Sequence, residues 1–322
     1  MHYPNSVGFA DSQPDRLDSS KYYDLAIIGA GSSSAYTLIH YITLLEQQCN
    51  LKAQLILNSE HRQHQPVRIL VTEKSGEFWT GVPYGMRSGR DALLISSLKE
   101  FMPQQLEREH FINWLDLHRE SIFAPADRHG ELARKWLSAN TSAMSDGRWD
   151  ELFLPRSIFG LYLQQRLTAL LAAASAKGLI EIDLVSVDVL DVRSIDGIYR
   201  IDGKNADRFW AKKLVLAIGS PPNVLFEECY STELESEICC VNNMYEPSLE
   251  ANIDRICNSL ESDRSARRQV LIIGSNASTL DALYSIQNSP RAASLIDKFI
   301  IISPNGAFPH RIGREVRVNA PK

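Results

Sequence analysis

The sequence lacks several features that would assign a protein to a functional class at once. Its five cysteines form no CxxC pair and lie near no histidine cluster with the spacing of metal ligands. We therefore expect neither a zinc site nor a disulfide framework, and we predict no metal ligands. Lys and Arg total 34 against 39 Asp and Glu, a formal net charge of −5, so no basic surface is expected to hold nucleic acid.

Long apolar runs are also missing. The longest, around residues 169–174, is far shorter than the roughly 20 apolar residues that a membrane-spanning helix requires. Residues 1–20 are polar and contain neither the apolar core of a signal peptide nor an Arg-rich transit pattern. We expect a mobile tail over 1–20 and a soluble, cytoplasmic protein that has no membrane partner.

The composition is that of an ordinary globular protein. Apolar residues make up 44% of the 322 residues and charged residues 23%, which is enough for a sizeable core. Length alone favours two domains or one elaborated domain.

The first ordered segment reads as a strand, a glycine turn and a helix. Residues 22–28 are a compact run of apolar, aromatic and β-branched residues that ends at glycine, which predicts a buried strand. Apolar residues at helical spacing then predict a helix over 32–48, and 67–74 reads as a second strand. Residues 51–57 either prolong the helix or form a separate short element.

The remaining pattern predicts an α/β protein with an inserted helical segment. Residues 92–154 read as helices and loops, with a loop at 138–148, and 158–176 reads as an amphipathic helix. Alternating residues over 180–219 predict a β-meander, and a second strand, glycine and helix begin near residue 269. We predict one domain over 21–230, with the helical insertion at about 92–154, and a second, shorter unit over 265–322.

The turn Gly29-x-Gly31-x-x-Ser34 matches the dinucleotide-binding fingerprint. The first glycine permits the tight turn, the second lets the backbone approach a diphosphate, and the third position needs only a small residue, which Ser34 is. The helix that opens at Ser32 adds unpaired N–H groups and a partial positive charge. This turn therefore predicts the diphosphate site of an adenine dinucleotide.

Two further positions fit the same cofactor. Glu73 ends the second strand, where a carboxylate accepts hydrogen bonds from ribose hydroxyls, although it lies 44 residues after Gly29 rather than the usual ~20. A solvated strand end is the alternative for Glu73, and the ribose role is favoured over it. Gly219 closes the last strand of the meander, which in flavoproteins of this topology returns beside the first turn. A plain strand ending before Pro221 and Pro222 is the alternative.

A second nucleotide signal lies near the end of the chain. Gly274-x-Asn276 follows a strand, and Asp281 lies on the next helix, as in the GxGxxxxD form of a dinucleotide site. Asn tolerates unusual backbone angles but carries a Cβ atom, which hinders the close approach of a diphosphate. This segment predicts NAD(P) binding. Together these signals predict a Rossmann-like FAD-binding domain over 21–230 and a second, incomplete Rossmann-like NAD(P)-binding unit over 265–322.

Longer strings resemble a known family. They are GEFWTGVPYG (76–85), DALLIS (91–96), FINWL (111–115), LPRSIFGLYL (154–163), LIIGSNASTLDAL (271–283) and IIISPNGAFPHR (300–311). Together they resemble the FAD/NAD(P)-binding oxidoreductases, which are mostly uncharacterised and distantly similar to flavin-dependent N-hydroxylating monooxygenases. The resemblance spans residues 22–311.

The resemblance implies roles for particular residues. Gly81, Tyr84 and Gly85 join Gly29, Gly31 and Glu73 as FAD-site positions, and Arg156 is implied to position the cofactor. The family's LLN string reads Leu93-Leu94-Ile95 here, which removes an amide side chain. Its SRxG string reads Ser303-Pro304-Asn305-Gly306, which removes an arginine that could bind the 2′-phosphate of NADPH.

The second nucleotide unit is short. After Asp281 only about 40 residues remain, whereas a complete domain usually needs on the order of 100. The expectations are a fragment, a complementing chain or second copy that supplies the rest, or a protein without full catalytic competence.

Three functions remain open. The first is an FAD enzyme that takes hydride from NAD(P)H and passes electrons to oxygen or a small organic substrate, with a monooxygenase as one form of it and no catalytic side chain identified. The second is a non-catalytic nucleotide-binding or interaction protein derived from such an enzyme. The third, an NAD-dependent dehydrogenase that uses the first turn alone, leaves the meander and Gly219 unexplained.

Overall fold

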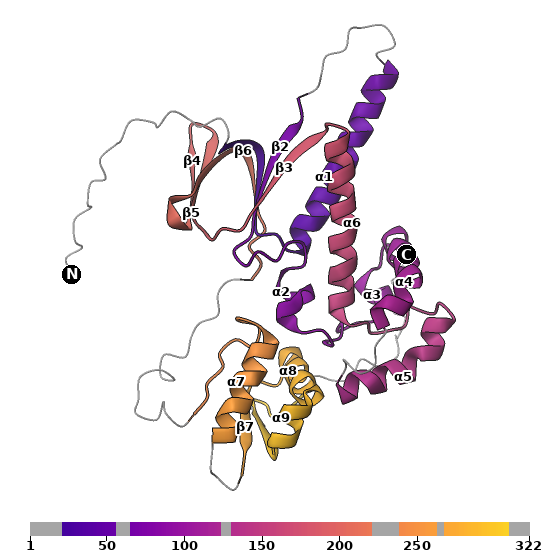
Figure 1. The fold of residues 1–322 in the computed structure, drawn as a ribbon, viewed down its shortest axis with the longest axis vertical. Coiled ribbons are helices and arrows are strands. Elements are labelled where there is room, and N and C mark those ends of the chain that lie inside the picture. The colour runs from indigo at the N-terminus through magenta and orange to yellow at the C-terminus, as the bar shows by residue number, and fades with distance from the viewer. Residues whose placement is uncertain (1–20, 56–64, 124–129, 221–237, 263–266, 309–322) are drawn as a thin grey trace, which may run out of the picture. The chain divides into compact units, whose positions relative to one another are not determined.

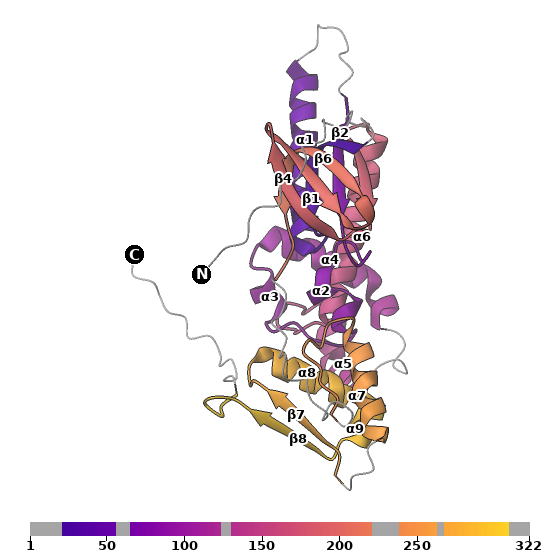
Figure 2. The same cartoon turned by 90° about the vertical axis from the view of Figure 1, so that its left-hand side faces the viewer.

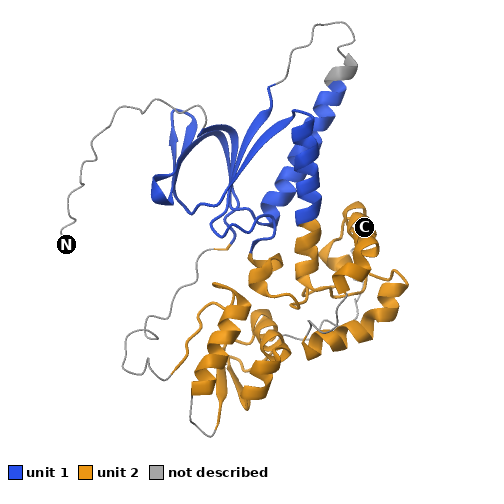
Figure 3. Cartoon of the chain, viewed as in Figure 1, with its two compact units in different colours: residues 1–81, 164–219 blue, residues 82–163, 220–322 orange. Residues whose placement is uncertain are grey.

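A computed structural model describes residues 21–55, 65–123, 130–220, 238–262 and 267–308. The chain divides into two compact units, residues 1–81 with 164–219 and residues 82–163 with 220–322 (Figure 3). The predicted tail at 1–20, the pair Pro221-Pro222 and the end of the last family string lie outside the described residues, as do the predicted domain limits at 230, 265 and 322.

Unit 1 contains a mixed six-stranded sheet (Figure 1). Its strands are β1 (Tyr22–Ile28), β2 (Val67–Thr72), β3 (Ile180–Val185), β4 (Val189–Ile195), β5 (Ile198–Gly203) and β6 (Arg208–Leu216). Their order is β3-β2-β1-β6-β5-β4. β1 pairs in parallel with β2 on one side and with β6 on the other, so the most buried strand lies at the centre, as expected for a parallel sheet.

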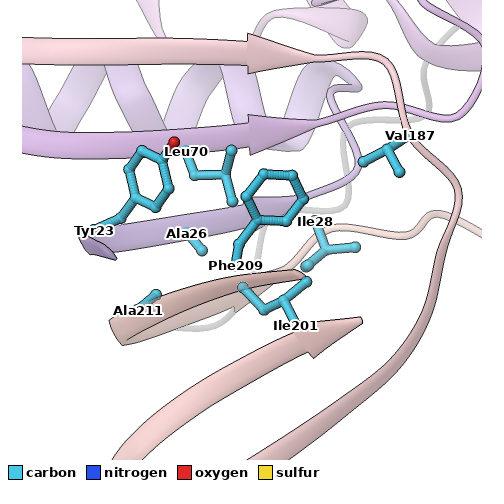
Figure 4. Close-up of a cluster of buried hydrophobic side chains, with 8 residues drawn as sticks. All are labelled: Tyr23, Ala26, Ile28, Leu70, Val187, Ile201, Phe209 and Ala211. Carbon is cyan, nitrogen blue, oxygen red and sulfur yellow. The ribbon is translucent and has the colours of Figure 1, made fainter. Parts of the chain in front are cut away.

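The meander is shorter than the sequence analysis predicts. Only β4, β5 and β6 form it, through antiparallel pairs, whereas β3 pairs in parallel with β2 at the opposite edge. The alternating pattern of residues 180–185 fits either position, and only long-range pairing separates them. Between the parallel strands and the meander lies a hydrophobic cluster that includes Tyr23, Leu70, Ile201 and Phe209 (Figure 4).

A long helix follows the first glycine turn. Helix α1 (Ser32–Leu55) extends the predicted helix through residues 51–55, so this segment prolongs the helix. Its Leu38 and Ile42 are fully buried. Helix α6 (Arg156–Ala176) is also confirmed, and the division between the two units falls within it, after Leu163.

Unit 2 begins with short helical elements and then two longer helices. They are α2 (Gly81–Tyr84, whose first residue closes unit 1), the 3-10 turn η2 (Met86–Ser88), α3 (Leu98–Phe101), α4 (Gln105–Phe123) and α5 (Glu131–Ser145). A second 3-10 turn, η4 (Lys204–Ala206), lies in unit 1. Residues 92–154 are therefore mainly helical, as predicted, and their role as an insertion into the first domain stays a prediction.

The loop predicted at 138–148 is wrong for most of its length. Helix α5 continues to Ser145, and only residues 146–148 turn. Ser, Asn and Thr dominate this stretch and have weak helix propensity, but Ala133 and Met144 on the same helix are buried. Packing of that face outweighs local propensity.

The C-terminal part of unit 2 is a β-α-β arrangement. It contains α7 (Leu249–Ser262), β7 (Gln269–Ile273), α8 (Ala277–Asn288), α9 (Pro290–Leu295) and β8 (Lys298–Ile302), with β7 and β8 paired in parallel. The three helices lie on one side of the strand pair (Figure 2). Residues 249–299 contribute to a second core cluster that includes Ile253, Cys257 and Ile286.

No helix in the described part of the chain has both the length and the apolar character that a membrane span requires.

Candidate functional site

The first glycine turn joins β1 to α1 and is tied to both neighbouring strands. The Gly29 amide donates to the Thr72 carbonyl of β2 at 2.9 Å, and the Ala217 amide beyond β6 donates to the Ile28 carbonyl at 2.8 Å. Gly29 has φ +89°, and a Cβ atom there would lie 2.4 Å from the Ala217 carbonyl oxygen. The first glycine is thus required by the protein's own backbone.

Gly31 differs in this respect. A Cβ atom at Gly31 would meet only the Gly81 Cα atom, at an ordinary contact distance of 3.7 Å. The chain itself therefore does not require glycine at this position. A bound group that approaches the backbone, such as a diphosphate, would require it, so the turn fits the predicted cofactor. Ser32 opens α1 next to this position.

Ser34 stabilises the turn from within. It is fully buried, and its Oγ donates to the Gly29 carbonyl oxygen. A third glycine would provide space for helix packing but no hydrogen bond. The serine therefore both fits the small space predicted for it and fixes the conformation of the first glycine.

Glu73 lies directly after β2 and is 8% exposed. One carboxylate oxygen, Oε2, accepts from the Ala30 amide at 3.0 Å, and the other, Oε1, accepts from the Ser75 amide at 3.1 Å and the Ser75 hydroxyl at 2.8 Å. The solvated strand end considered above is thus wrong: the carboxylate is buried against the glycine turn.

The segment after Glu73 returns to the same turn. The Trp79 amide donates to the Ala30 carbonyl at 2.6 Å, and Gly81 follows at φ +63° beside Gly31. Trp79 is 3% exposed and has φ +79°, an outlier for a bulky residue. Strain of this kind persists only where surrounding contacts enforce it, and it is concentrated at functional sites.

Gly219 lies at the same end of the sheet but not in the turn. It is exposed at φ +74°, and a Cβ atom built on it meets nothing within 4 Å. Ala217, two residues earlier, is the residue of this strand end that touches Gly29. The return of β6 beside the first turn is confirmed, and contact through Gly219 itself stays a prediction.

Two of the family strings contact each other in unit 2, through Tyr84 of string 76–85 and Gly160 of string 154–163. A Cβ atom at Gly160 on α6 would lie 2.0 Å from the Tyr84 carbonyl oxygen, so glycine is needed for this close approach. The Tyr84 ring packs edge-on against Phe101 and Phe159, and the next residue, Gly85, is buried. Burial raises the pKa of the Tyr84 phenol above its usual value.

The second glycine turn repeats the first in detail. The Gly274 amide donates to the Ile302 carbonyl of the adjacent parallel strand at 2.8 Å, as Gly29 does to Thr72. Thr279, five residues after Gly274, donates its hydroxyl to the Gly274 carbonyl at 3.0 Å, as Ser34 does to Gly29. The two strand-glycine-helix segments therefore resemble each other even in the side-chain hydroxyl that bonds to the carbonyl of the first glycine.

Asn276 caps helix α8. Its side chain accepts from the Ala277 amide at 2.9 Å, and its backbone is extended, with φ −86° and ψ −173°. No left-handed conformation is required there, so Asn replaces glycine without strain. The amide side chain occupies the helix N-terminus with a neutral oxygen.

Asp281 is held by two side chains of unit 2. It forms a short ion pair with Arg156 and accepts a hydrogen bond from the Tyr245 hydroxyl at 2.5 Å. The Arg156 and Asp281 side chains are only 14% and 16% exposed. Burial alone would lower the pKa of the Arg156 guanidinium, but Asp281 and Tyr245 hold it above its usual value. Burial, followed by Asp281, raises the pKa of Tyr245.

The structure thus gathers the predicted residues into two groups. In unit 1, Gly29, Gly31, Ser32, Ser34, Glu73 and Gly81 surround one turn, with Gly219 at the adjacent strand end. In unit 2, Arg156 meets Asp281 on the helix after Gly274 and Asn276, and Tyr84 and Gly85 lie against α6. Among the described residues no cluster of His, Cys, Asp and Glu is arranged to hold a metal ion.

Sequence reasoning missed three contributors. Ala217 acts through its backbone and Trp79 through an amide in a left-handed conformation, and neither leaves a mark in the residue pattern. Tyr245 lies outside every motif. A single tyrosine shortly after Asn242 and Asn243 is too weak a signal to predict a functional role for Tyr245.

Comparison with known proteins shows the family of this chain. The model of FAD-NAD(P)-binding proteins matches residues 26–221, more than half of the chain. The chain belongs to the FAD-NAD(P)-binding family. This membership confirms the resemblance, the Rossmann-like α/β class and the expectation of FAD and NAD(P) as cofactors, and it supports an oxidoreductase.

Curated relatives include uncharacterized proteins of Mycobacterium bovis and Mycobacterium tuberculosis. Each is 31% identical over 296 residues, which cover 90% of this chain and 52% of the relative. The chain therefore spans about half the length of the curated relatives it matches.

Solved structures with a similar fold include a hydroxylase and a monooxygenase. Reduced ornithine hydroxylase of Pseudomonas aeruginosa is 15% identical, with 87% of this chain and 54% of that chain covered and a TM-score of 0.46. Cyclohexanone monooxygenase from Rhodococcus sp. Phi1, bound to NADP+, is 11% identical, with 88% and 38% covered and a TM-score of 0.40. These likenesses carry no argument about chemistry.

Proposed function

We propose that the chain is an FAD-dependent oxidoreductase that uses NAD(P)H and acts on a small organic substrate. The observation that carries the proposal is the contrast between the two glycines of the first turn. Gly29 is required by the Ala217 backbone, whereas Gly31 faces only an ordinary contact within the protein. Glycine at that position is explained by a ligand that approaches the backbone.

In this proposal the first turn holds the FAD diphosphate. The Gly31 backbone and the N-terminus of α1 at Ser32 face the negative charge, and Ser34 keeps the turn in its conformation. Glu73 is held beside the turn by Ala30 and Ser75, so its carboxylate would lie where the ribose hydroxyls of the cofactor are expected. Each group is positioned before binding, which lowers the entropic cost of holding the cofactor.

A bound flavin would supply the redox chemistry, the transfer of electrons from NAD(P)H to oxygen or an organic acceptor. Tyr84, Gly85 and Arg156 remain candidates for orienting the reactants. The close approach of Gly160 holds Tyr84 against α6, and the ion pair with Asp281 fixes Arg156. Gly219, Gly274 and Asn276 remain predicted nucleotide-site positions.

A non-catalytic nucleotide-binding protein is the second candidate. It is favoured by Asp281, which Arg156 and Tyr245 already engage, so that this carboxylate is less available to a second nucleotide. A complementing chain or a second copy that completes the NAD(P) unit also stays a prediction.

The test is spectroscopic. Purified protein should show flavin absorbance at about 370 and 450 nm, and anaerobic addition of NADH or NADPH should bleach the latter band. The Glu73→Gln variant should lose FAD affinity by about tenfold, because one carboxylate oxygen is replaced by a donor. The exposed Glu151→Gln serves as its control.

Each outcome selects one function. Protein that stays colourless after incubation with FAD would refute the flavin site. Flavin that binds but is not bleached by either reductant would establish the non-catalytic alternative.

A further inference from the structure

The position of Glu73 is fixed through both its main chain and its side chain. The Glu73 amide donates to the Val185 carbonyl at 3.0 Å, and the Val187 amide donates to the Glu73 carbonyl at 3.2 Å. The carboxylate oxygen Oε2 accepts from the Ala30 amide at 3.0 Å. A single bond to Oε2 would still let the carboxylate plane rotate, because the last torsion of a glutamate side chain has broad energy minima.

Ser75 restrains this rotation by contacting the other oxygen. Its amide donates to Oε1 of Glu73 at 3.1 Å, and its hydroxyl donates to the same oxygen at 2.8 Å. The Ser75 hydroxyl also accepts from the Glu77 amide at 3.3 Å, so the loop holds this hydroxyl in place while its proton is directed to the carboxylate. Donors from Ala30 and Ser75 together fix the plane of the Glu73 carboxylate.

The loop that carries Ser75 begins and ends at the first glycine turn. Ala30, the residue between the two glycines of that turn, is fully buried and also accepts from the Trp79 amide at 2.6 Å. Gly81 then lies beside Gly31. The carboxylate is therefore oriented by a loop whose two ends are both anchored to the turn, and all of these residues belong to unit 1.

We propose that Ser75 is a positioning residue for cofactor recognition. Its hydroxyl orients the Glu73 carboxylate so that the site selects an adenine dinucleotide with free ribose hydroxyls over one that lacks them. Ser75 acts through Glu73 and is not itself a ligand of the cofactor. The inference rests on the proposed function, in which Glu73 receives the ribose hydroxyls of FAD.

A purely structural role for Ser75 has different consequences. Ser75 is exposed, and its hydroxyl also closes the turn to Glu77. If this turn were its whole contribution, removal of the hydroxyl would weaken every ligand of the site equally. A positioning role weakens only the part of the binding that depends on the ribose hydroxyls.

The test compares FAD with an analogue whose adenosine ribose lacks both hydroxyls, prepared from FMN and dideoxy-ATP. Binding to the flavin-free full chain is followed by the change in flavin fluorescence. The wild type should bind FAD about tenfold or more tightly than the analogue, because the ribose hydroxyls donate to a charged carboxylate. Ser75→Ala should reduce this preference by about three- to fivefold and leave the affinity for the analogue within about twofold of the wild type.

Three further variants identify the route of the effect. Ser75→Thr keeps the hydroxyl and should restore the preference for FAD. Adding Ser75→Ala to Glu73→Gln should change the preference no further, because the hydroxyl acts through the carboxylate. Ser194→Ala, which removes an exposed serine hydroxyl from β4, is the matched control and should behave as the wild type.

The outcomes separate this inference from the proposed function. A wild type that binds no FAD, or that binds FAD and the analogue equally, would overturn the proposed ribose site and the role of Ser75 with it. A wild type that prefers FAD, combined with a Ser75→Ala variant that keeps the same preference, would overturn the role of Ser75 alone. Failure of Ser75→Thr to restore the preference would also overturn it.

Discussion

Replacing each glycine of the first turn by alanine should separate the needs of the protein from those of its cofactor. At Gly29 the added Cβ would lie 2.4 Å from the Ala217 carbonyl oxygen, and φ +89° is unfavourable for any L residue. At Gly31 the added Cβ would lie 3.7 Å from the Gly81 Cα atom, which is an ordinary contact.

The expected magnitudes follow from these contacts. Placing an L residue in the left-handed region costs about 1–2 kcal/mol, and moving the Ala217 backbone sacrifices its hydrogen bond to Ile28, worth about 1 kcal/mol. Gly29→Ala should therefore lower the free energy of unfolding by about 3 kcal/mol and the melting temperature by about 6–12 °C. Gly31→Ala should change the free energy of unfolding by less than about 0.5 kcal/mol.

The assay combines two measurements on the same preparations. Thermal unfolding of the flavin-free variants, followed by circular dichroism, gives stability, and titration with FAD gives affinity. Gly31→Ala should keep its stability but lose FAD affinity by about tenfold or more, because its methyl group enters the space assigned to the diphosphate. Equal destabilisation by the two variants would refute the structural contrast, and normal FAD binding by Gly31→Ala would refute the assigned cofactor position.

Three further predictions concern unit 2. Gly160→Ala should lower the free energy of unfolding in urea by about 2 kcal/mol, because the added Cβ would lie 2.0 Å from the Tyr84 carbonyl oxygen. Alanine normally favours a helix over glycine, so a stabilised variant would contradict this packing. Asp281→Asn should lower the free energy of unfolding by about 2 kcal/mol, because the Arg156 guanidinium loses its charged partner. In a double-mutant cycle, adding Arg156→Met should recover part of this loss. Additive losses would argue against the ion pair. The folded pKa of Tyr284, about 12, exceeds its ordinary 10.0, so its contribution to stability is complete below pH 10.0 and is lost as the pH rises toward 12. Unfolding measured across this range should be less pH-dependent in Tyr284→Phe, and an unchanged slope would argue against the burial of this phenol.

Local sequence patterns were enough to predict the parts of the site that are built from residues close together in the sequence. The strand before Gly29, the turn and helix α1 follow from a compact apolar run, two glycines and helical spacing. Glu73 was identified because a carboxylate at a strand end has a recognised use, despite its unusual distance from Gly29.

Other parts depend on contacts that no local pattern encodes. The separation of β3 from the meander is decided by pairing with β2, and the length of α5 is decided by packing of its buried face. The pairing of Arg156 with Asp281 spans 125 residues, and each residue was predicted to serve a cofactor site on its own. Recognising that they meet required coordinates.

Unit 1 is built from two stretches of the chain, residues 1–81 and 164–219, and this affects how it folds during synthesis. Strand β1 pairs with β6, and the ion pair of Asp24 with Lys212 joins positions 188 residues apart. A ribosome adds about 5–20 residues each second, so the edge of β1 that β6 later covers waits roughly 10–40 seconds for its partner. Nascent chains that stop before β6 should therefore be the aggregation-prone intermediates of this protein, with an open strand edge that invites chaperone capture.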